Sequence, residues 1–390
     1  MPQHIVMVGC SAPSHVYPSL ALIRELTGRG HRVSYVVGEP LTGLVEPTGA
    51  EVVAHPTIFP IGDAAAWPED PADGIRVFLD EAITIHPQLT ARFDEDRPDL
   101  LLYDIGGLGA PLLGERYGVP AVQLSPSMVA WDGYEQDLAE VLGPLRSSPS
   151  GVDYNRAYTE WLKENGIIAE GWDWIAHPGQ VLSLIPRAMQ PNAERVPSNV
   201  RFVGPCLDPL RLADRSWTPP ADGKPVLLVS FGTAFTDQLD VYRACISAFA
   251  DSGWHVVLSI GKHVPAEDLG PLPDSFEAHE SVPQLAVLAA ASAFITHAGM
   301  GSCTESLWFG VPTVAIPQAV DQFGNAALLE SLGVGRHLPA AEVTAESLRE
   351  AVDAVSSDPE VAARLATLKA ESRANGGVSI AADAVESFLK

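Results

Sequence analysis

The stretch HIVMVGCSAPSHVYPSLALIRELTGRGHRVSYVV, residues 4–37, contains the pattern that decides the fold. Residues 4–9 form a short apolar run that is typical of a buried parallel strand, and residues 32–37 form a second one. Between them, Pro18 begins a helical pattern whose apolar residues fall on one face, and a glycine ends it. This order predicts a βαβ unit whose first loop covers residues 10–17.

The same alternation of strand and helix continues through the rest of the chain. Further strands are expected at 51–54, 99–104, 121–124, 226–231, 254–260, 294–297 and 313–316. Prolines crowd the region 185–225 and separate the two halves. We therefore predict an α/β protein with two Rossmann-like domains, each a doubly wound parallel sheet. The first domain would cover residues 1–205 and the second residues 226–375, joined by a linker at 206–225.

Composition narrows the classes of partner and location. The 390 residues carry a formal net charge of −25, which disfavours binding to nucleic acid or to an anionic membrane. The four cysteines have neither C-x-x-C nor metal-like spacing, so reduced thiols in the cytoplasm are expected. The amino terminus does not read as a signal peptide, and apolar runs fall short of the roughly 20 residues that span a bilayer. The sequence leaves open whether the protein is a monomer or a homodimer.

Two polar residues in the first half lie where ligands bind in such a fold. In open α/β sheets, ligands bind at the carboxyl ends of the strands. His15 lies in the first predicted loop, and Asp104 ends the predicted strand 99–104. A His–Asp pair suits a general base, because the carboxylate fixes the imidazole tautomer and stabilises the imidazolium. The alternative is a loop histidine and a strand-end carboxylate that bonds to backbone.

The segment FITHAGMGSCTE, residues 294–305, is the strongest candidate for a ligand site in the second half. A buried strand leads to His297, and a turn of small residues then leads into a helix. Glycines allow close backbone approach, and the free N–H groups and dipole of a helix start favour an anion such as phosphate. His297 can add a hydrogen bond or a positive charge. The alternative is a tight turn with a core histidine.

Two more loops of the second half bring polar residues to the same sheet edge. Asp321 and Gln322 open a predicted helix, where Asp321 is either an N-cap or, with Gln322, part of a pair that binds sugar hydroxyls. Ser230 and Thr233 lie at the end of the predicted strand 226–231 and just after it.

The motifs together keep an order and spacing that resembles a known family. They are SHVYP (14–18), PDLLLYD (98–104), VSFGTAF (229–235), VPQ (282–284), THAGMGSCTE (296–305) and IPQAVDQFGN (316–325). Over nearly the whole chain they resemble the UDP-glycosyltransferase superfamily, and most of all its bacterial macrolide glycosyltransferases. The resemblance implies the GT-B fold, in which two doubly wound domains face each other across a cleft. It also implies that residues 376–390 form a helix that crosses back onto the N-terminal domain.

The resemblance implies a role for each site residue. His15 would be the catalytic base and Asp104 its charge partner. Glu305 would bind the ribose of the donor, and Asp321 with Gln322 would bind the transferred sugar. The whole donor-binding set would be Ser230, Gly232, Thr233, Val282, Gln284, His297, Gly299, Gly301, Ser302, Glu305, Asp321 and Gln322.

The implied reaction is inverting transfer of a hexose, expected from UDP-glucose, to a hydroxyl group of a small hydrophobic acceptor such as a macrolide or a phenolic. No metal and no further cofactor are expected, because the D-x-D match at 94–96 lies in a polar run after a helix. Trp67, Phe78 and Trp131 could line the acceptor site, together with loops near 58–75 and 140–180. The sequence does not decide between resistance, detoxification and biosynthesis.

Two positions depart from the family pattern. Many relatives carry Trp where this chain has Ser281, so recognition of the base must use groups around Val282, and the choice between uridine and thymidine diphosphate stays open. Ala298 replaces a glycine, and Gly301 stands where some relatives have Asn. Both residues are small, so close approach of the backbone is kept.

Other enzyme classes fit the sequence less well. A serine hydrolase would need a G-x-S-x-G elbow, which the chain lacks. In a nicotinamide dehydrogenase, the glycine fingerprint would open the first βα turn, whereas Gly107-x-Gly109 lacks the third glycine and comes later. A nucleotide-sugar epimerase and a non-catalytic sugar-nucleotide binding protein of the same fold remain as alternatives.

Overall fold

The computed structural model describes residues 2–61, 67–233 and 235–389, and the chain forms two compact units. Unit 1 contains Met1–Ile185, Asn192–Cys206 and Gly376–Lys390. Unit 2 contains Pro186–Pro191 and Leu207–Asn375. Most of the region predicted as a linker therefore groups with unit 2. The short segment 186–191 groups there too, because its 3₁₀ turn Arg187–Met189 contacts a helix of that unit.

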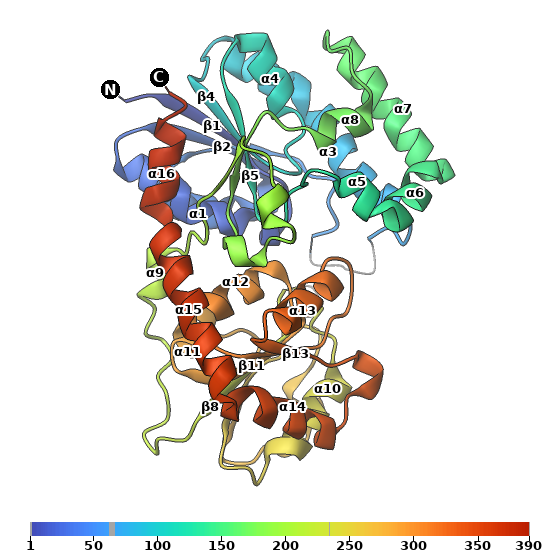
Figure 1. Ribbon diagram of the computed structural model, residues 1–390. Coiled ribbons are helices and arrows are strands. Elements are labelled where there is room, and N and C mark those ends of the chain that lie inside the picture. The colour runs from blue at the N-terminus through green and yellow to red at the C-terminus, as the bar shows by residue number, and fades with distance from the viewer. Residues whose placement is uncertain (1, 62–66, 234, 390) are drawn as a thin grey trace. The chain divides into compact units, whose positions relative to one another are not determined.

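Unit 1 is built on a seven-stranded parallel sheet in the order β3-β2-β1-β4-β5-β6-β7 (Figure 1). The order changes direction between β1 and β4, which creates a switch point where loops on both sides diverge and leave room for a ligand. The strands are β1 (His4–Val8), β2 (Arg32–Gly38), β3 (Glu51–His55), β4 (Leu100–Asp104), β5 (Ala121–Ser125), β6 (Gln180–Ser183) and β7 (Val200–Phe202).

The first helix begins earlier than the sequence pattern predicts. Helix α1 covers Pro13–Gly28, so Pro18 lies inside it and His15 lies in its first turn rather than in a loop. Pro13 is at the first helical position, where a proline loses no hydrogen bond. The sequence pattern predicted the start at Pro18 rather than at Pro13. The helix can contain Pro18 because a proline within the first two turns removes only one intrahelical hydrogen bond.

Helices also fill the region 140–180, which was expected to be a loop. Three of them follow one another there: α6 (Ala139–Ser147), α7 (Pro149–Glu164) and α8 (Gly171–Ala176). Helix α7 buries Tyr154, Tyr158 and Trp161 along one face. These aromatic side chains form a small core with α3, so their role is in packing. The other α-helices of the first part of unit 1, after α1, are α2 (Thr42–Val45), α3 (Pro71–Asp94), α4 (Ala110–Tyr117) and α5 (Tyr134–Asp137).

The last helix of the chain, α16 (Val378–Glu386), packs against α1 from the other end of the sequence (Figure 1). Its buried face joins the core beneath the sheet, and Val385 is fully buried there. Arg29 at the end of α1 donates hydrogen bonds to Asp383 and Glu386 at 2.6 and 3.1 Å. The carboxyl-terminal helix thus belongs to the core of unit 1.

Unit 2 has a six-stranded parallel sheet in the order β10-β9-β8-β11-β12-β13, which changes direction between β8 and β11 (Figure 1). Its strands are β8 (Val226–Ser230), β9 (His255–Ser259), β10 (Phe276–His279), β11 (Ala291–Thr296), β12 (Thr313–Ala315) and β13 (Gly335–His337). Its helices are α9 (Pro209–Leu212), α10 (Leu239–Phe249), α11 (Gln284–Leu288), α12 (Met300–Phe309), α13 (Gln322–Ser331), α14 (Ala345–Ser357) and α15 (Pro359–Asn375).

Central strands are buried on both faces, as their continuous apolar sequences predict. All residues of β1, β4 and β8 are buried. Helices therefore cover both faces of each sheet, which is the doubly wound architecture expected from the sequence. Among the described helices, none combines the length and the apolar character needed to cross a membrane.

A core truncation tests the packing of unit 2. Phe294 in β11 is fully buried, so Phe294→Ala should lower the free energy of unfolding by about 3–5 kcal/mol, measured by denaturant titration. Phe323→Ala removes the same atoms from a half-exposed ring and should change it by less than about 0.5 kcal/mol. Equal effects of the two variants would contradict this packing.

Candidate active site

Unit 1 brings His15 and Asp104 together at its switch point. His15 Nδ1 lies 2.9 Å from Asp104 Oδ1, so the two residues form a hydrogen bond across 89 positions of sequence. Asp104 is buried at the end of β4, and the His15 side chain is about one fifth exposed. Because a carboxylate can only accept, the proton lies on Nδ1, and Nε2 carries the lone pair. In this geometry the Asp104 carboxylate fixes the tautomer of the His15 imidazole, as in a general base.

The loop after β4 holds the Asp104 carboxylate in place. The Gly106 amide donates to Asp104 Oδ1 at 2.8 Å, and the Gly107 amide donates to the Asp104 carbonyl at 2.7 Å. A side chain at Gly106 would collide with Phe78, because an added Cβ would lie 2.5 Å from its ring. The glycine therefore lets the aromatic ring approach the pair.

Two of the three predicted acceptor-site aromatics gather near His15. The Phe78 ring lies 5.9 Å from the His15 ring and 5.9 Å from the Trp67 ring. Phe59, which was not predicted, joins them at 5.0 Å from Phe78. Trp131 instead packs on Tyr134 at 5.0 Å and donates through Nε1 to Asp137. Residues 62–66 of the expected acceptor loop lie outside the described residues.

One group of possible metal ligands exists among the described residues, and it overlaps this pair. Ligand atoms of Cys10, His15 and Asp104 all lie within 4.8 Å of one another. Burial raises the pKa of the Cys10 thiol well above its usual value, so the neutral thiol, which is a poor ligand, is favoured. The D-x-D carboxylates Asp94 and Asp96 are bound by arginines, Asp94 by Arg116 and Asp96 by Arg32.

In unit 2, His297 lies between two glycines at the carboxyl ends of β8 and β11. A Cβ added to Gly232 would lie 2.7 Å from the His297 ring, and one added to Gly299 would lie 2.4 Å from it. Only glycine fits at either position. Ser230 ends β8 and is buried, whereas Thr233 is exposed on the loop that follows. These residues therefore form one compact group around an imidazole.

Burial lowers the pKa of His297 to about 4, and a hydrogen bond with the Ser230 backbone acts in the opposite direction. The ring is therefore neutral near pH 7 and can offer a hydrogen bond but no charge. Of the two options left open by the sequence, the structure favours the hydrogen bond.

The residue after His297 has a backbone conformation that favours glycine. Ala298 has φ of 61°, in the left-handed region, which costs a residue with a Cβ roughly 1–2 kcal/mol. Gly299 is the N-cap of α12, and the first N–H that bonds within the helix is that of Cys303, to the Gly299 carbonyl at 3.1 Å. The amides of Met300, Gly301 and Ser302 come before it, and the first turn has no acidic residue. This helix start suits an anion.

Glu305, further along α12, is bound by two side chains. Its carboxylate accepts from Gln284 Nε2 at 2.6 Å and forms an ion pair with Arg211 at 3.0 Å. Gln284 begins α11, two residues after Val282, whose side chain packs against a small core of unit 2. Arg211 lies in α9 and was not predicted from the sequence.

Asp321 and Gln322 both stand at the start of α13, but they contact different groups. Asp321 makes no side-chain cap bond, and its Oδ2 accepts from Asn325 Nδ2 at 2.9 Å. Gln322 Oε1 accepts from the Gln318 and Ala319 amides at 2.8 and 3.1 Å, so it fixes the preceding loop. Asp321 is the N-cap residue by position, but its exposed side chain does not form the expected capping hydrogen bond.

Comparisons with known proteins identify the family of this chain. The C-terminal domain of erythromycin biosynthesis protein CIII-like proteins matches residues 245–385. Oleandomycin glycosyltransferase from Streptomyces antibioticus is 46% identical over all of this chain and 91% of its own length. NDP-glycosyltransferase YjiC from Bacillus subtilis is 35% identical, over 99% of this chain and 97% of its own. The chain belongs to the macrolide glycosyltransferase family.

Solved structures place this glycosyltransferase in the GT-B fold. The glycotransferase of kitacinnamycin superposes with a TM-score of 0.91 at 42% identity, over 100% of this chain and 99% of that one. The calicheamicin glycosyltransferase CalG4 superposes with a TM-score of 0.87 at 32% identity, over 100% and 98%. The family and fold expected from the six motifs are therefore confirmed.

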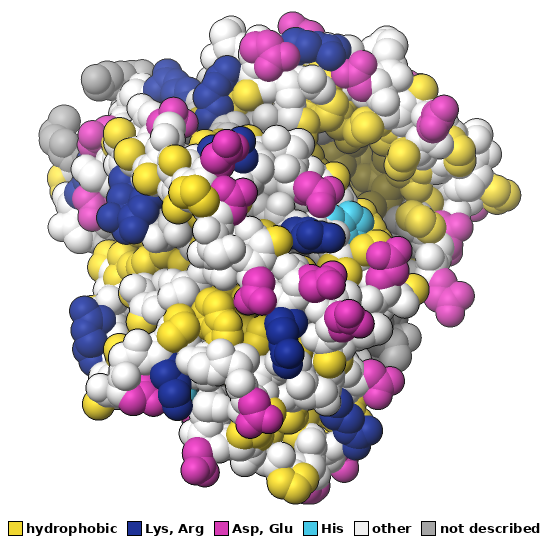
Figure 2. Space-filling model, turned by 60° about the horizontal axis from the view of Figure 1, so that its bottom comes forward, with side chains coloured by type: hydrophobic (Ala, Val, Ile, Leu, Met, Phe, Trp, Pro, Cys, Tyr) yellow, Lys and Arg dark blue, Asp and Glu magenta, His cyan; other side chains and the backbone are white. Residues whose placement is uncertain are grey.

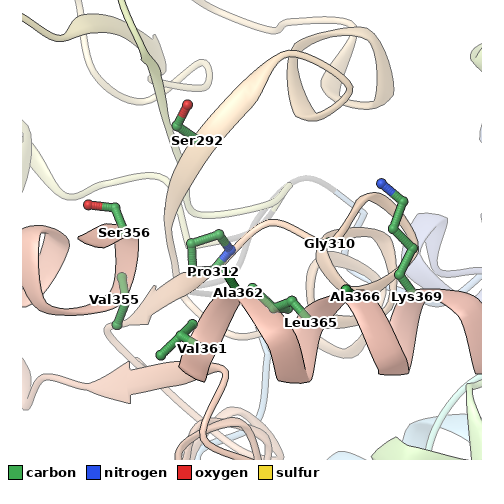
Figure 3. A pocket seen from close by; sticks show the side chains of 10 residues that line it. All are labelled: Ser292, Gly310, Pro312, Val355, Ser356, Val361, Ala362, Leu365, Ala366 and Lys369. Atoms are coloured by element: carbon green, nitrogen blue, oxygen red, sulfur yellow. The ribbon is translucent and has the colours of Figure 1, made fainter. Parts of the chain in front are cut away.

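A separate pocket of the glycosyltransferase lies away from these loops. It has a volume of about 280 Å³, and Figure 3 shows Val361, Leu365 and Lys369 projecting into it from α15. Ser292 on its wall is near the start of β11, whereas His297 follows the end of that strand. The pocket is thus at the amino ends of the strands, opposite to the end where His297 lies. Lys369 donates a hydrogen bond to the Phe309 carbonyl there at 2.7 Å.

Among the described residues, the face drawn in Figure 2 shows no continuous patch of Lys and Arg that could attract an anion, because acidic side chains are scattered among the basic ones. The chain as a whole carries a net charge of −25. The free amides at the start of α12 are a local donor group that suits an anion in such an acidic chain.

The protonation state of His297 can be measured directly. Because its pKa is about 4, its ring should keep the nuclear magnetic resonance signals of a neutral imidazole between about pH 5 and 7.5, with His297→Gln used for assignment. The buried neutral ring stabilises the fold above the unfolded pKa of about 6.5, and this contribution is lost as the pH falls towards 4. A protonated ring at pH 6 would contradict the assignment.

Proposed function

We propose that this glycosyltransferase transfers a hexose from UDP-glucose, with inversion, to a hydroxyl group of a small hydrophobic acceptor such as a macrolide or a phenolic. The observation that supports this most strongly is the 2.9 Å hydrogen bond between His15 Nδ1 and Asp104 Oδ1. The pair supplies a base at the switch point of the sheet, where this fold binds ligands. The ring of Phe78 lies beside it and suits an apolar acceptor. The relatives named above are glycosyltransferases, one of them for oleandomycin.

In the proposed reaction, His15 Nε2 takes the proton of the acceptor hydroxyl as its oxygen bonds to the anomeric carbon. The bond from that carbon to the diphosphate oxygen breaks, and its electron pair leaves with UDP. The proton stays on the imidazole, and the Asp104 carboxylate stabilises the resulting cation. A single displacement of this kind turns an α-linked donor into a β-glycoside.

The donor-binding roles rest on the geometry of unit 2. The amides of residues 300–302 and neutral His297 would stabilise the charge that develops on the leaving diphosphate. Glu305 would accept from the ribose hydroxyls, and Asp321 with Gln322 would contact the transferred sugar. Ser230, Gly232 and Thr233 would line the phosphate side, and groups at Val282 would meet the base.

We also propose that transfer needs no metal, because amides at a helix start can supply the stabilisation that a cation would otherwise give. The cytoplasm is the proposed place of action, and the four buried free cysteines suit a reducing environment.

Replacement of the base tests the catalytic half. His15→Ala should lower kcat by roughly 10²–10⁴-fold, measured by product mass, while the dissociation constant for UDP stays unchanged by calorimetry. Asp104→Asn should act in the same direction, because it removes the charge that stabilises the imidazolium. The exposed His177→Ala should have no effect. Full turnover by His15→Ala would sink the assignment.

The same assay separates the two alternatives. An epimerase would consume UDP-glucose with no acceptor present, whereas a transferase leaves the hexose unchanged. A non-catalytic binding protein would bind UDP and form no product with any member of a panel of macrolides and phenolics.

Metal removal tests the role of the amides. After dialysis against EDTA, turnover should be unchanged, because the proposed stabilisation of the diphosphate is built from protein donors. Loss of turnover that Mn²⁺ or Mg²⁺ restores would show that a cation performs this task.

A further inference from the structure

We infer that Asn325 is a positioning residue. It links Ala298, in the turn before the helix start proposed to bind the diphosphate, to the carboxylate of Asp321, which is proposed to bind the sugar. It is fully buried in the first turns of α13. Its Nδ2 donates to the Ala298 carbonyl at 3.0 Å and to Asp321 Oδ2 at 2.9 Å. One side chain thus bonds to both elements of the donor half, and this inference rests on the proposed donor-binding function.

The orientation of the amide follows from its partners. A backbone carbonyl and a carboxylate can only accept, so the nitrogen of Asn325, which has two hydrogens, must face both of them. Each hydrogen serves one partner. An aspartate of the same shape would place an acceptor against two acceptors, and a leucine would have no donor.

The bond to Ala298 controls the direction of the amides that follow. Ala298 holds a left-handed conformation, which persists only where neighbouring groups enforce it. Its carbonyl and the Gly299 N–H share one planar trans peptide, so they point in opposite directions. When Asn325 binds the carbonyl, the Gly299 N–H points away from α13, and the start of α12 is set with it.

The bond to Asp321 orients the other element. Asp321 is exposed and makes no cap bond, so its carboxylate would otherwise be free to rotate. With Oδ2 bound by Asn325, the second oxygen has a defined direction for a sugar hydroxyl. Loss of Asn325 should therefore disturb the diphosphate and the sugar contacts together.

The experiment is a double-mutant cycle on donor binding. The variants Asn325→Leu, Asp321→Ala and their combination are titrated with UDP and with UDP-glucose by calorimetry, without acceptor. Asp321→Ala should weaken only UDP-glucose. Asn325→Leu should weaken UDP about tenfold and UDP-glucose by more, since buried hydrogen bonds to both elements are lost. The double variant should bind UDP-glucose within about threefold of Asn325→Leu, because the two residues act as a unit.

A matched control separates positioning from stability. Leu329→Ala removes a fully buried side chain one turn further along the same helix, so it should lower Tm yet leave both dissociation constants unchanged. If Asn325→Leu fails to fold by circular dichroism, Asn325→Ala takes its place in the cycle.

Two results would overturn the inference: an unchanged affinity of the Asn325 variant for UDP, or additive losses from Asn325→Leu and Asp321→Ala. Failure of the proposed donor-binding role looks different, because the wild-type protein would then bind neither nucleotide, and failure of the proposed transfer alone would leave both affinities intact while no glycoside is formed.

Discussion

The hydrogen bond between His15 and Asp104 depends on the pairing of two strands that are far apart in sequence. β1 and β4 are neighbours in register, with Val8 opposite Tyr103, so the loop after β1 and the last residue of β4 end at the same edge. The buried carboxylate needs a partner there, because an unpaired charge at that depth is costly. The imidazole supplies the partner, and it gains a fixed tautomer in return.

The same constraint acts in unit 2. β8 and β11 pair with Ser230 opposite Thr296, which sets the loop containing Gly232 against the one containing His297. The close approach is possible because glycines stand on both sides of the ring. In each unit the proposed site residues therefore lie at the point where the strand order changes direction, where parallel pairing brings them together.

Much of this could be predicted from the sequence, because buried parallel strands leave continuous apolar runs and ligands bind at their carboxyl ends. That rule predicted that His15, Asp104 and His297 lie at these strand ends, and the structure places them there. Side-chain contacts were less accessible: Trp131 packs away from Phe78, and no periodicity reveals which aromatic ring faces a ligand. The helices over 139–176 were predicted as loops, although Tyr154, Tyr158 and Trp161 in α7 recur at the spacing of a helix face. Asn325 and Arg211 were missed because nothing local marks them, and only tertiary contacts show that they bind site residues.

The central claim is that His15 drives a single displacement at the anomeric carbon. The most direct measurement is the configuration of the product, read from the coupling constant of its anomeric proton after reaction with UDP-α-glucose. We expect the large coupling of a β-glucoside, formed with inversion. The small coupling of an α-glucoside would mean retention of configuration, and would contradict a mechanism in which one base-assisted attack completes the transfer.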